Sequence, residues 1–156
     1  MYKRQAHYLI SHVASRLVFL AGEAVVLVGF SYVAFGVTVQ GSLLELSLVS
    51  LLGAMSFGGV ALLVASRAQT VEAVSGLLNL VMLPMWVLSG VFFASSNFPP
   101  AMQPVVQALP LTALNDALRG IVNEGLPLTA LAGELAIMAA WGVVCFGLAL
   151  RQFRWR

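Results

Sequence analysis

Four apolar runs, separated by short polar segments, constrain this chain more than any other feature of its sequence. They cover about residues 17–37, 43–64, 71–93 and 129–150. A helix rises about 1.5 Å per residue, so roughly 20 residues cross the ~30 Å hydrocarbon core of a bilayer. Only 9% of the 156 residues are charged, against about 25% in soluble domains. The sequence therefore predicts an all-α integral membrane protein with four transmembrane helices.

The segment before the first run is polar and basic. Residues 1–16 suit a short helix lying on the membrane surface. The apolar run that follows from Leu17 is longer than the roughly 7–15 residues of a cleaved signal peptide. We therefore interpret it as a retained first span.

The third run ends in an unusual way. Pro84 interrupts it, and Ser89-Gly90 closes it. A proline inside a helix frees the carbonyl one turn earlier, which membrane helices tolerate when another group binds it. Asn79 could supply that group, or its amide could bond across to another helix.

The segment from 94 to 128 holds five of the six prolines and does not form another long apolar run. Two short amphipathic helices are expected, the first within 100–109 and the second from about Leu111. On the second, Asp116 and Arg119 have the i,i+3 spacing of an ion pair. Neither helix is expected to exceed roughly 13 residues, or ~20 Å, so neither can span a bilayer. Residues 94–128 are therefore predicted to form a re-entrant helical hairpin before the last span.

Small residues recur at every fourth position in two of the runs. Such stripes allow a neighbouring helix to pack closely in a membrane. The second run contains Ser50, Ala54 and Gly58, and the fourth contains Ala132, Ala136 and Ala140. We expect these two stripes to be helix-packing faces.

The residues that carry chemistry are few. The only lysine, Lys3, follows no glycine-rich run, so a phosphate-binding loop is absent from this sequence. No His, Cys, Asp or Glu cluster has metal-ligand spacing, and the single cysteine excludes an internal disulfide. Glu23 and Glu134 lie inside spans but near an end of each, so they are either functional intramembrane carboxylates or interfacial groups. We expect no enzyme activity and no bound cofactor or metal.

Basic residues fix the expected orientation. Four spans place both termini on one side, which collects seven of the eight basic residues. These are Lys3, Arg4, Arg16, Arg67, Arg151, Arg154 and Arg156. Only Arg119 lies on the other side. The positive-inside rule predicts cytoplasmic termini and an external hairpin. We expect the protein in the plasma (inner) membrane. A net charge of +2 gives no indication of nucleic-acid binding.

The stretch from 79 to 120 resembles the type-2 permease family of ATP-binding cassette (ABC) transporters. The residues that carry the resemblance are Asn79, Leu80, Pro84, Leu88, Ser89, Gly90, Phe98, Pro99, Pro110, Leu111, Asp116, Leu118 and Arg119. The family layout of a penultimate span, an external hairpin and a final span also agrees. The resemblance implies a single transmembrane domain over 1–156 that matches the last four of the six spans in the family.

That departure from six spans has two interpretations. A truncated gene or misplaced start codon is the first, and a short subunit completed by a companion chain is the second. By resemblance, the working unit contains two permease halves, expected to be a homodimer, and two ABC ATPase subunits that hydrolyse ATP. Residues 1–16 would then hold the coupling helix, with Lys3, Arg4, His7 and Tyr8 as candidates for contact with the ATPase. A simple positive-inside flank is the alternative role for these four residues.

The implied function is export of amphipathic, lipid-like or glycan cargo, with the hairpin forming or gating the outer exit. Two other functions remain open from the residues alone. A small four-span scaffold or assembly factor would have no transport activity. An ion-coupled carrier would require Glu23 or Glu134 to titrate during transport.

Overall fold

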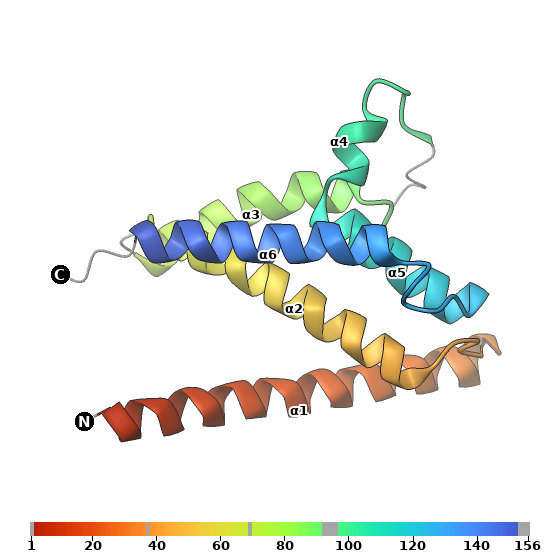
Figure 1. Cartoon of the computed structure of the whole chain (residues 1–156), viewed down its shortest axis with the longest axis horizontal. Coiled ribbons are helices and arrows are strands. Elements are labelled where there is room, and N and C mark those ends of the chain that lie inside the picture. The colour runs from red at the N-terminus through yellow and green to blue at the C-terminus, as the bar shows by residue number, and fades with distance from the viewer. Residues whose placement is uncertain (1, 37, 69, 92–96, 153–156) are drawn as a thin grey trace. The chain divides into compact units, whose positions relative to one another are not determined.

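The computed structural model describes residues 2–36, 38–68, 70–91 and 97–152, without the side chains of 2–14, 16, 17 and 20. Six helices are found there, and no strand. The helices are α1 (Tyr2–Phe35), α2 (Leu43–Ala65), α3 (Val71–Leu88), α4 (Gln103–Gln107), α5 (Pro110–Glu124) and α6 (Ala132–Gln152) (Figure 1). The prediction of an all-helical protein is confirmed. The chain divides into two units, residues 1–39 and 40–156, and each is described by itself.

Three of the helices are long and apolar enough to cross a membrane. These candidate spans are α2, α3 and α6, which the sequence predicted to within a few residues except at the end of α3. That helix ends at Leu88 rather than at about Phe93, since Ser89 and Gly90 turn the chain. The predicted first span corresponds to a shorter described apolar stretch, Ala21–Phe35 of α1. The structure therefore supports three candidate spans and one shorter apolar helix.

The first unit consists chiefly of α1. One uninterrupted helix runs from Tyr2 to Phe35, so the predicted surface segment and first span are not separated by a break. Gly36 follows with a φ of 65°, a left-handed conformation that glycine adopts without steric cost. The described apolar side chains of α1 are mostly exposed within this unit.

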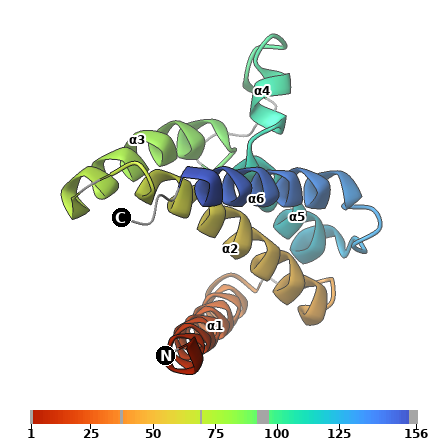
Figure 2. The same cartoon turned by 60° about the vertical axis from the view of Figure 1, so that its left-hand side comes forward.

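The second unit is built on the pairing of α2 with α6, which make the most extensive helix–helix contact. Close approach is possible because small residues line the contact. A Cβ atom added to Gly59 would lie 3.1 Å from the Gly142 carbonyl oxygen, and one added to Gly142 would lie 3.5 Å from the Ser56 Cα. Cys145 is buried beside Gly59. Figures 1 and 2 show α6 lying over α2 along this contact.

Most residues of the predicted small-residue stripes are not buried in the contact between these helices. Of the α2 stripe, Ala54 is exposed, whereas Ser50 and Gly58 are half-buried; Ala132, Ala136 and Ala140 on α6 are exposed. The buried residues lie elsewhere, at Val49, Gly53, Ser56, Gly59 and Val60 of α2 and at Met138, Cys145 and Ala149 of α6. Both faces of each helix are apolar and rich in small residues, so their spacing alone did not identify the packed face.

The short helix α5 closes one end of the α2–α6 pair. Pro110 occupies its first turn, where a missing backbone N–H costs nothing, and Gly125 caps its end with a φ of 64°. Ile121 is fully buried, and Leu114 and Leu118 pack against the same core, so α5 has the apolar face expected of an amphipathic helix. The rest of this core is Val49, Ala113, Ala117, Leu131 and Met138.

The loop before α2 is also fixed to α5. The Gln40 backbone N–H donates to the Val122 carbonyl oxygen at 3.0 Å. A Cβ atom on Gly41 would come within 2.7 Å of the Ile121 carbonyl oxygen, so only glycine fits there without a shift. The end of α5 is therefore held against the start of α2.

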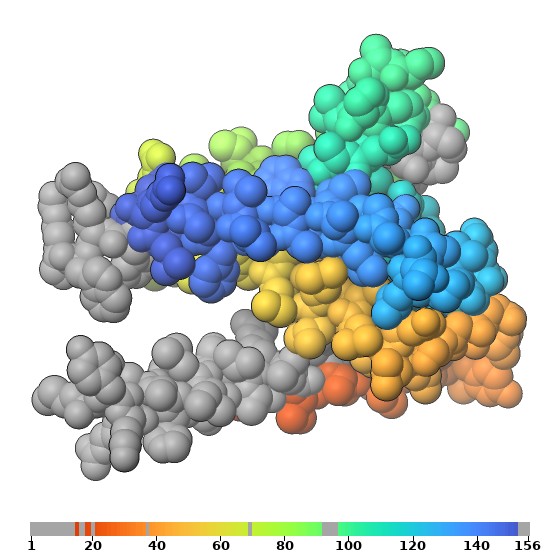
Figure 3. Space-filling model, in the orientation of Figure 1, coloured from red at the N-terminus to blue at the C-terminus, as the bar shows by residue number. Residues whose placement is uncertain are grey.

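The predicted hairpin region contains two helices of unequal length. The first, α4, has only five residues and stands out from the rest of its unit (Figures 2 and 3). Within α4, Val106 is buried and Val105 is exposed, and Met102 just before the helix is also exposed. The second, α5, has 15 residues and so exceeds the expected length, but at about 22 Å it remains short of a bilayer core.

Candidate functional site

The end of α3 is the place where the predicted site residues come together. The last carbonyl groups of a helix have no partner within the helix and must be bound from outside. At Ser89 the chain leaves the helix, and Gly90 takes a φ of 80°. Both residues are buried, so water does not supply the missing partners.

Two side chains of α5 bind these carbonyl groups. The Asn115 side-chain amide donates from Nδ2 to the Ser89 carbonyl oxygen at 3.2 Å. The Arg119 guanidinium donates from Nη2 to the Gly90 carbonyl oxygen at 2.8 Å. Asn115 and Arg119 are four residues apart and therefore lie on the same face of α5. We call these two hydrogen bonds the α3–α5 contact.

The charge on Arg119 suits this position. The carboxyl end of a helix carries a partial negative charge, which a nearby cation stabilises. Hydrogen bonds from a charged donor are also stronger than those between neutral groups. The α3–α5 contact therefore holds the end of α3 against α5.

The predicted ion pair between Asp116 and Arg119 is replaced by this arrangement. Within the described residues no ion pair joins them, because the guanidinium is directed to Gly90. Partial burial raises the pKa of the Asp116 carboxyl above its ordinary value near 3.8. The Arg119 charge lowers that pKa and the Glu134 charge raises it, each less than burial does. Asp116 is thus a half-buried carboxyl beside the contact rather than its anionic partner.

Two more side chains bind the backbone around α4. The Trp141 indole N–H on α6 donates to the Ala108 carbonyl oxygen at 2.8 Å. The Gln103 amide donates to the Phe98 carbonyl oxygen at 3.0 Å, which organises the turn containing Pro99. These bonds link the loop between α4 and α5 to a candidate span, and the start of α4 to the segment before it.

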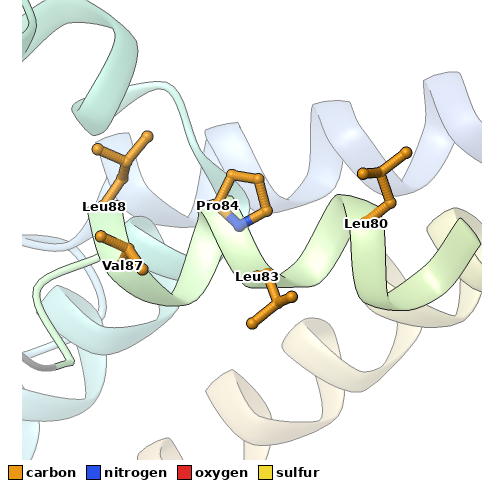
Figure 4. Close-up of a pocket in the computed structure, with 5 residues that line it drawn as sticks. All are labelled: Leu80, Leu83, Pro84, Val87 and Leu88. Carbon is orange, nitrogen blue, oxygen red and sulfur yellow. The ribbon is translucent and has the colours of Figure 1, made fainter. Parts of the chain in front are cut away.

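The remaining predicted residues lie outside the α3–α5 contact. On α3, Asn79 is exposed and no described residue bonds to its amide, so it does not cap the carbonyl freed by Pro84. The helix continues through Pro84. Figure 4 shows an open apolar groove along this part of α3, lined by Leu80, Leu83, Pro84, Val87 and Leu88.

The predicted carboxylates and coupling residues are placed differently. Glu134 lies in the first turn of α6 and is half-buried, whereas Glu23 is exposed on α1. Lys3, Arg4, His7 and Tyr8 belong to the part of α1 whose side chains are outside the described set. Within the described part of the chain, no three His, Cys, Asp or Glu side chains are grouped so as to hold a metal ion.

Sequence reasoning identified Ser89, Gly90 and Arg119 but missed Asn115 and Trp141. A signal for Asn115 was present, because it precedes Arg119 by one helical turn and is polar on a helix with an apolar face. Trp141 gave no such signal, since a tryptophan inside an apolar run is equally compatible with lipid contact.

The amino-acid sequence is similar to one family of known proteins. The family model described as "ABC-2 type transporter" matches residues 1–123. Nodulation protein J from Rhizobium meliloti (strain 1021) is 31% identical over 137 residues, which are 88% of this chain and 51% of that protein. The chain thus spans about half the length of this curated relative. No solved structure gives a significant match.

Proposed function

The chain belongs to the ABC-2 type transporter family, and from this premise we propose that it is the permease subunit of an ABC exporter. In this proposal it moves amphipathic, lipid-like or glycan cargo outward across the plasma (inner) membrane. A separate ABC ATPase subunit binds and hydrolyses ATP, and two permease halves form the transmembrane path. The permease itself carries out no covalent chemistry.

The α3–α5 contact is the observation that supports this proposal most directly. A permease must transmit movement from its cytoplasmic side to its exit without losing the connection between spans and exit segments. Asn115 and Arg119 bind α5 to the Ser89 and Gly90 carbonyls directly after α3, so a displacement of α3 is carried to α5 through two hydrogen bonds. In this proposal, α4 and α5 belong to a re-entrant hairpin at 94–128. The role of this hairpin is to form or gate the exit.

The charge distribution supports the orientation. Arg67 follows α2, and Arg151 lies in the last turn of α6, so both are on the side opposite α5. The positive-inside rule assigns that side, with both chain ends, to the cytoplasm. In addition to α2, α3 and α6, we assign the apolar part of α1 as a span, the first of four along the chain. It would be completed by residues before Ala21.

The basic start of α1 is the proposed contact with the ATPase. Because α1 is one continuous helix, a force applied near Lys3 and Arg4 would be carried along its axis into the membrane. His7 and Tyr8 lie one turn further on and complete the proposed coupling surface. Surface helices of this kind also rest on lipid headgroups, which basic residues favour.

Copurification tests the proposal at this coupling surface. The full chain, with an affinity tag after Arg156, is expressed in its own cells, and ABC ATPase subunits are identified among the copurified proteins by their phosphate-binding loop. We expect an ATPase with the wild-type chain and its loss when Lys3, Arg4, His7 and Tyr8 are replaced by alanine. Replacement of the exposed Glu124 by glutamine is the matched control and should retain it.

The hairpin is tested separately. Arg119→Ala removes the bond to Gly90 and should lower export while leaving membrane insertion and ATPase copurification intact. Arg119→Lys keeps the charge and should retain part of the activity. Intact chain recovered without any ATPase would contradict the permease proposal and support a membrane scaffold. Unchanged export by Arg119→Ala would remove the gate from the proposal.

A further inference from the structure

Two arginines lie at the end of the second unit where α2 and α6 finish. Arg67 directly follows α2, and its backbone N–H donates to the Val64 carbonyl oxygen at 3.1 Å, which fixes its position at the helix end. Arg151 lies in the last turn of α6. Both arginines are exposed, whereas Gln152 beside them is half-buried. We call Arg67, Arg151 and Gln152 the arginine site.

A hydrogen bond within the arginine site orients one of the two guanidinium groups. Arg67 donates from Nε to the side-chain Oε1 of Gln152, which joins the end of α2 to the end of α6. A guanidinium carries five N–H groups, so the four on its two Nη atoms are left for another acceptor. Those groups form a planar fork that matches two oxygens of a phosphate. Gln152 is neutral, so it holds Arg67 without neutralising its charge.

The described part of the chain supplies no anion for this site. No described carboxylate forms an ion pair with Arg67 or Arg151. The acidic residue at this end of the unit is Glu72, which is exposed in the first turn of α3, where the positive end of the helix dipole stabilises it. Gln152 directly follows Arg151 and bonds to Arg67, so two like charges lie close together. An anion bound between them would relieve their repulsion.

One face of α6 leads from the arginine site into the apolar part of the helix. Val144, Leu148 and Arg151 follow the i, i+4, i+7 spacing of a single helical face. The side chains of Val144 and Leu148 are 56% and 41% exposed. Figure 2 shows the first turns of α3 separated from α6, so α3 does not cover this face there. A face with hydrocarbon along the span and a cation at its end matches the two parts of a phospholipid, an acyl chain and a phosphate.

We propose that the arginine site binds the headgroup phosphate of an anionic phospholipid, whose acyl chain lies along Val144 and Leu148. Basic groups between membrane helices on the cytoplasmic side favour anionic headgroups, because that leaflet is rich in anionic lipids. Arg67 comes from the end of α2 and Arg151 from the end of α6. A phosphate held by both therefore joins the same two helix ends as the bond between Arg67 and Gln152.

Lipid binding by the detergent-solubilised full chain tests this site. Dioleoyl phosphatidylglycerol, which is anionic, is compared with dioleoyl phosphatidylcholine, which has the same acyl chains and no net charge. Bound lipid is measured by native mass spectrometry, and the unfolding temperature is recorded in parallel. We expect preferential binding of phosphatidylglycerol and a higher unfolding temperature in its presence. Arg67→Gln and Arg151→Gln should each lower its affinity roughly fivefold.

Two variants that keep the net charge separate a formed site from a general electrostatic attraction. Gln152→Leu removes the acceptor that orients Arg67, and Arg67→Lys keeps the charge but loses the planar fork. Each should weaken phosphatidylglycerol binding at least twofold. Gln107→Leu is the matched control, because it removes an exposed amide from α4, and it should bind like the wild type. Wild-type binding by both Gln152→Leu and Arg67→Lys would overturn the site.

A soluble anion distinguishes a lipid from a free phosphate. Glycerol 3-phosphate carries the phosphate without acyl chains and should give no measurable rise in unfolding temperature. A rise equal to that with phosphatidylglycerol, or equal binding of the two lipids, would overturn the proposal.

The inference depends on the orientation in the proposed function only to assign the lipid to the cytoplasmic leaflet. Its measurements need no ATPase and no transport. Selective phosphatidylglycerol binding by a chain that copurifies with no ATPase would therefore count against the permease function alone. Loss of selectivity with the ATPase still present would count against the lipid site alone.

Discussion

Gly90 is the residue at which the end of α3 depends on a single backbone conformation. Its φ of 80° lies in the left-handed region, which is open to glycine and unfavourable for other residues. That conformation turns the Gly90 carbonyl to Arg119, so the backbone turn and the hydrogen bond depend on each other. The sequence signal here was the pair Ser89-Gly90, although the predicted span continued past this pair to about Phe93.

Gly90→Ala tests this dependence. A side chain at this φ should lower the free energy of unfolding by about 1–2 kcal/mol. Gly76→Ala is the matched control on α3, because an added Cβ atom there meets nothing within 4 Å. Removing a glycine from a helix interior should leave stability unchanged or raise it by about 0.5–1 kcal/mol. Thermal unfolding of the detergent-solubilised variants measures both, and equal stability of the two would contradict the assigned turn.

The stability of the folded protein should depend on pH through Asp116, and the burial of this carboxyl sets the direction of the dependence. Its folded-state pKa is raised, so the folded protein holds this proton more tightly than the unfolded chain does. The contribution of Asp116 to stability is therefore fully present below about pH 3.8 and is lost as pH rises through the folded-state pKa. Asp116→Asn should be more stable than the wild type at pH 7.

The difference between Asp116→Asn and the wild type should shrink as the pH falls towards 3.8, the ordinary value for this carboxyl. Unfolding temperatures measured from pH 7 downward would show it. Two neighbouring charges affect the result, since Arg119 lowers this pKa and Glu134 raises it. Glu134→Gln should therefore reduce the pH dependence of the wild type. A stability difference that is the same at all pH values would contradict the assignment.

At the scale of helices, the existence and approximate limits of the long elements followed from apolar runs and turn residues. The contacts between these helices did not follow from the same sequence features. In water, an apolar stripe on a helix identifies the face that packs inward. In a membrane, the lipid-facing surface is equally apolar, so α2 and α6 carry no such stripe. The packed face was consequently assigned to Ala54 and Ala136, which are exposed, instead of Gly59 and Cys145.

Two adjacent glycines on α2 allow a direct test of that packing. A Cβ atom on Gly59 would lie 3.1 Å from the Gly142 carbonyl oxygen, whereas one on Gly58 meets nothing within 4 Å. Gly59→Ala should therefore separate α2 from α6 and lower the unfolding free energy by about 1–3 kcal/mol, the usual cost of overpacking. Gly58→Ala should be neutral or stabilising. Equal unfolding temperatures would show that α2 and α6 do not pack as described.

At the scale of the whole molecule, family membership agrees with the described residues, which are all-helical and include three candidate membrane spans. The sequence resemblance identified most of the residues at the end of α3 because turn-forming residues and charges are rare in an apolar sequence. It could not show that Asn115 binds Ser89 or that Trp141 binds Ala108. Those bonds join residues 26 and 33 positions apart, and only the folded chain brings them together.

Orientation in the membrane is the claim on which the exit role of α4 and α5 depends. It is measured most directly by labelling single cysteines in intact cells with a reagent that does not cross membranes. On a Cys145→Ala background, Val105→Cys lies on the exposed surface of α4, and Ala68→Cys lies between α2 and α3. We predict that Val105→Cys is labelled in intact cells and that Ala68→Cys is labelled only after the cells are permeabilised. Labelling of Ala68→Cys but not Val105→Cys in intact cells would place the hairpin in the cytoplasm and contradict the account.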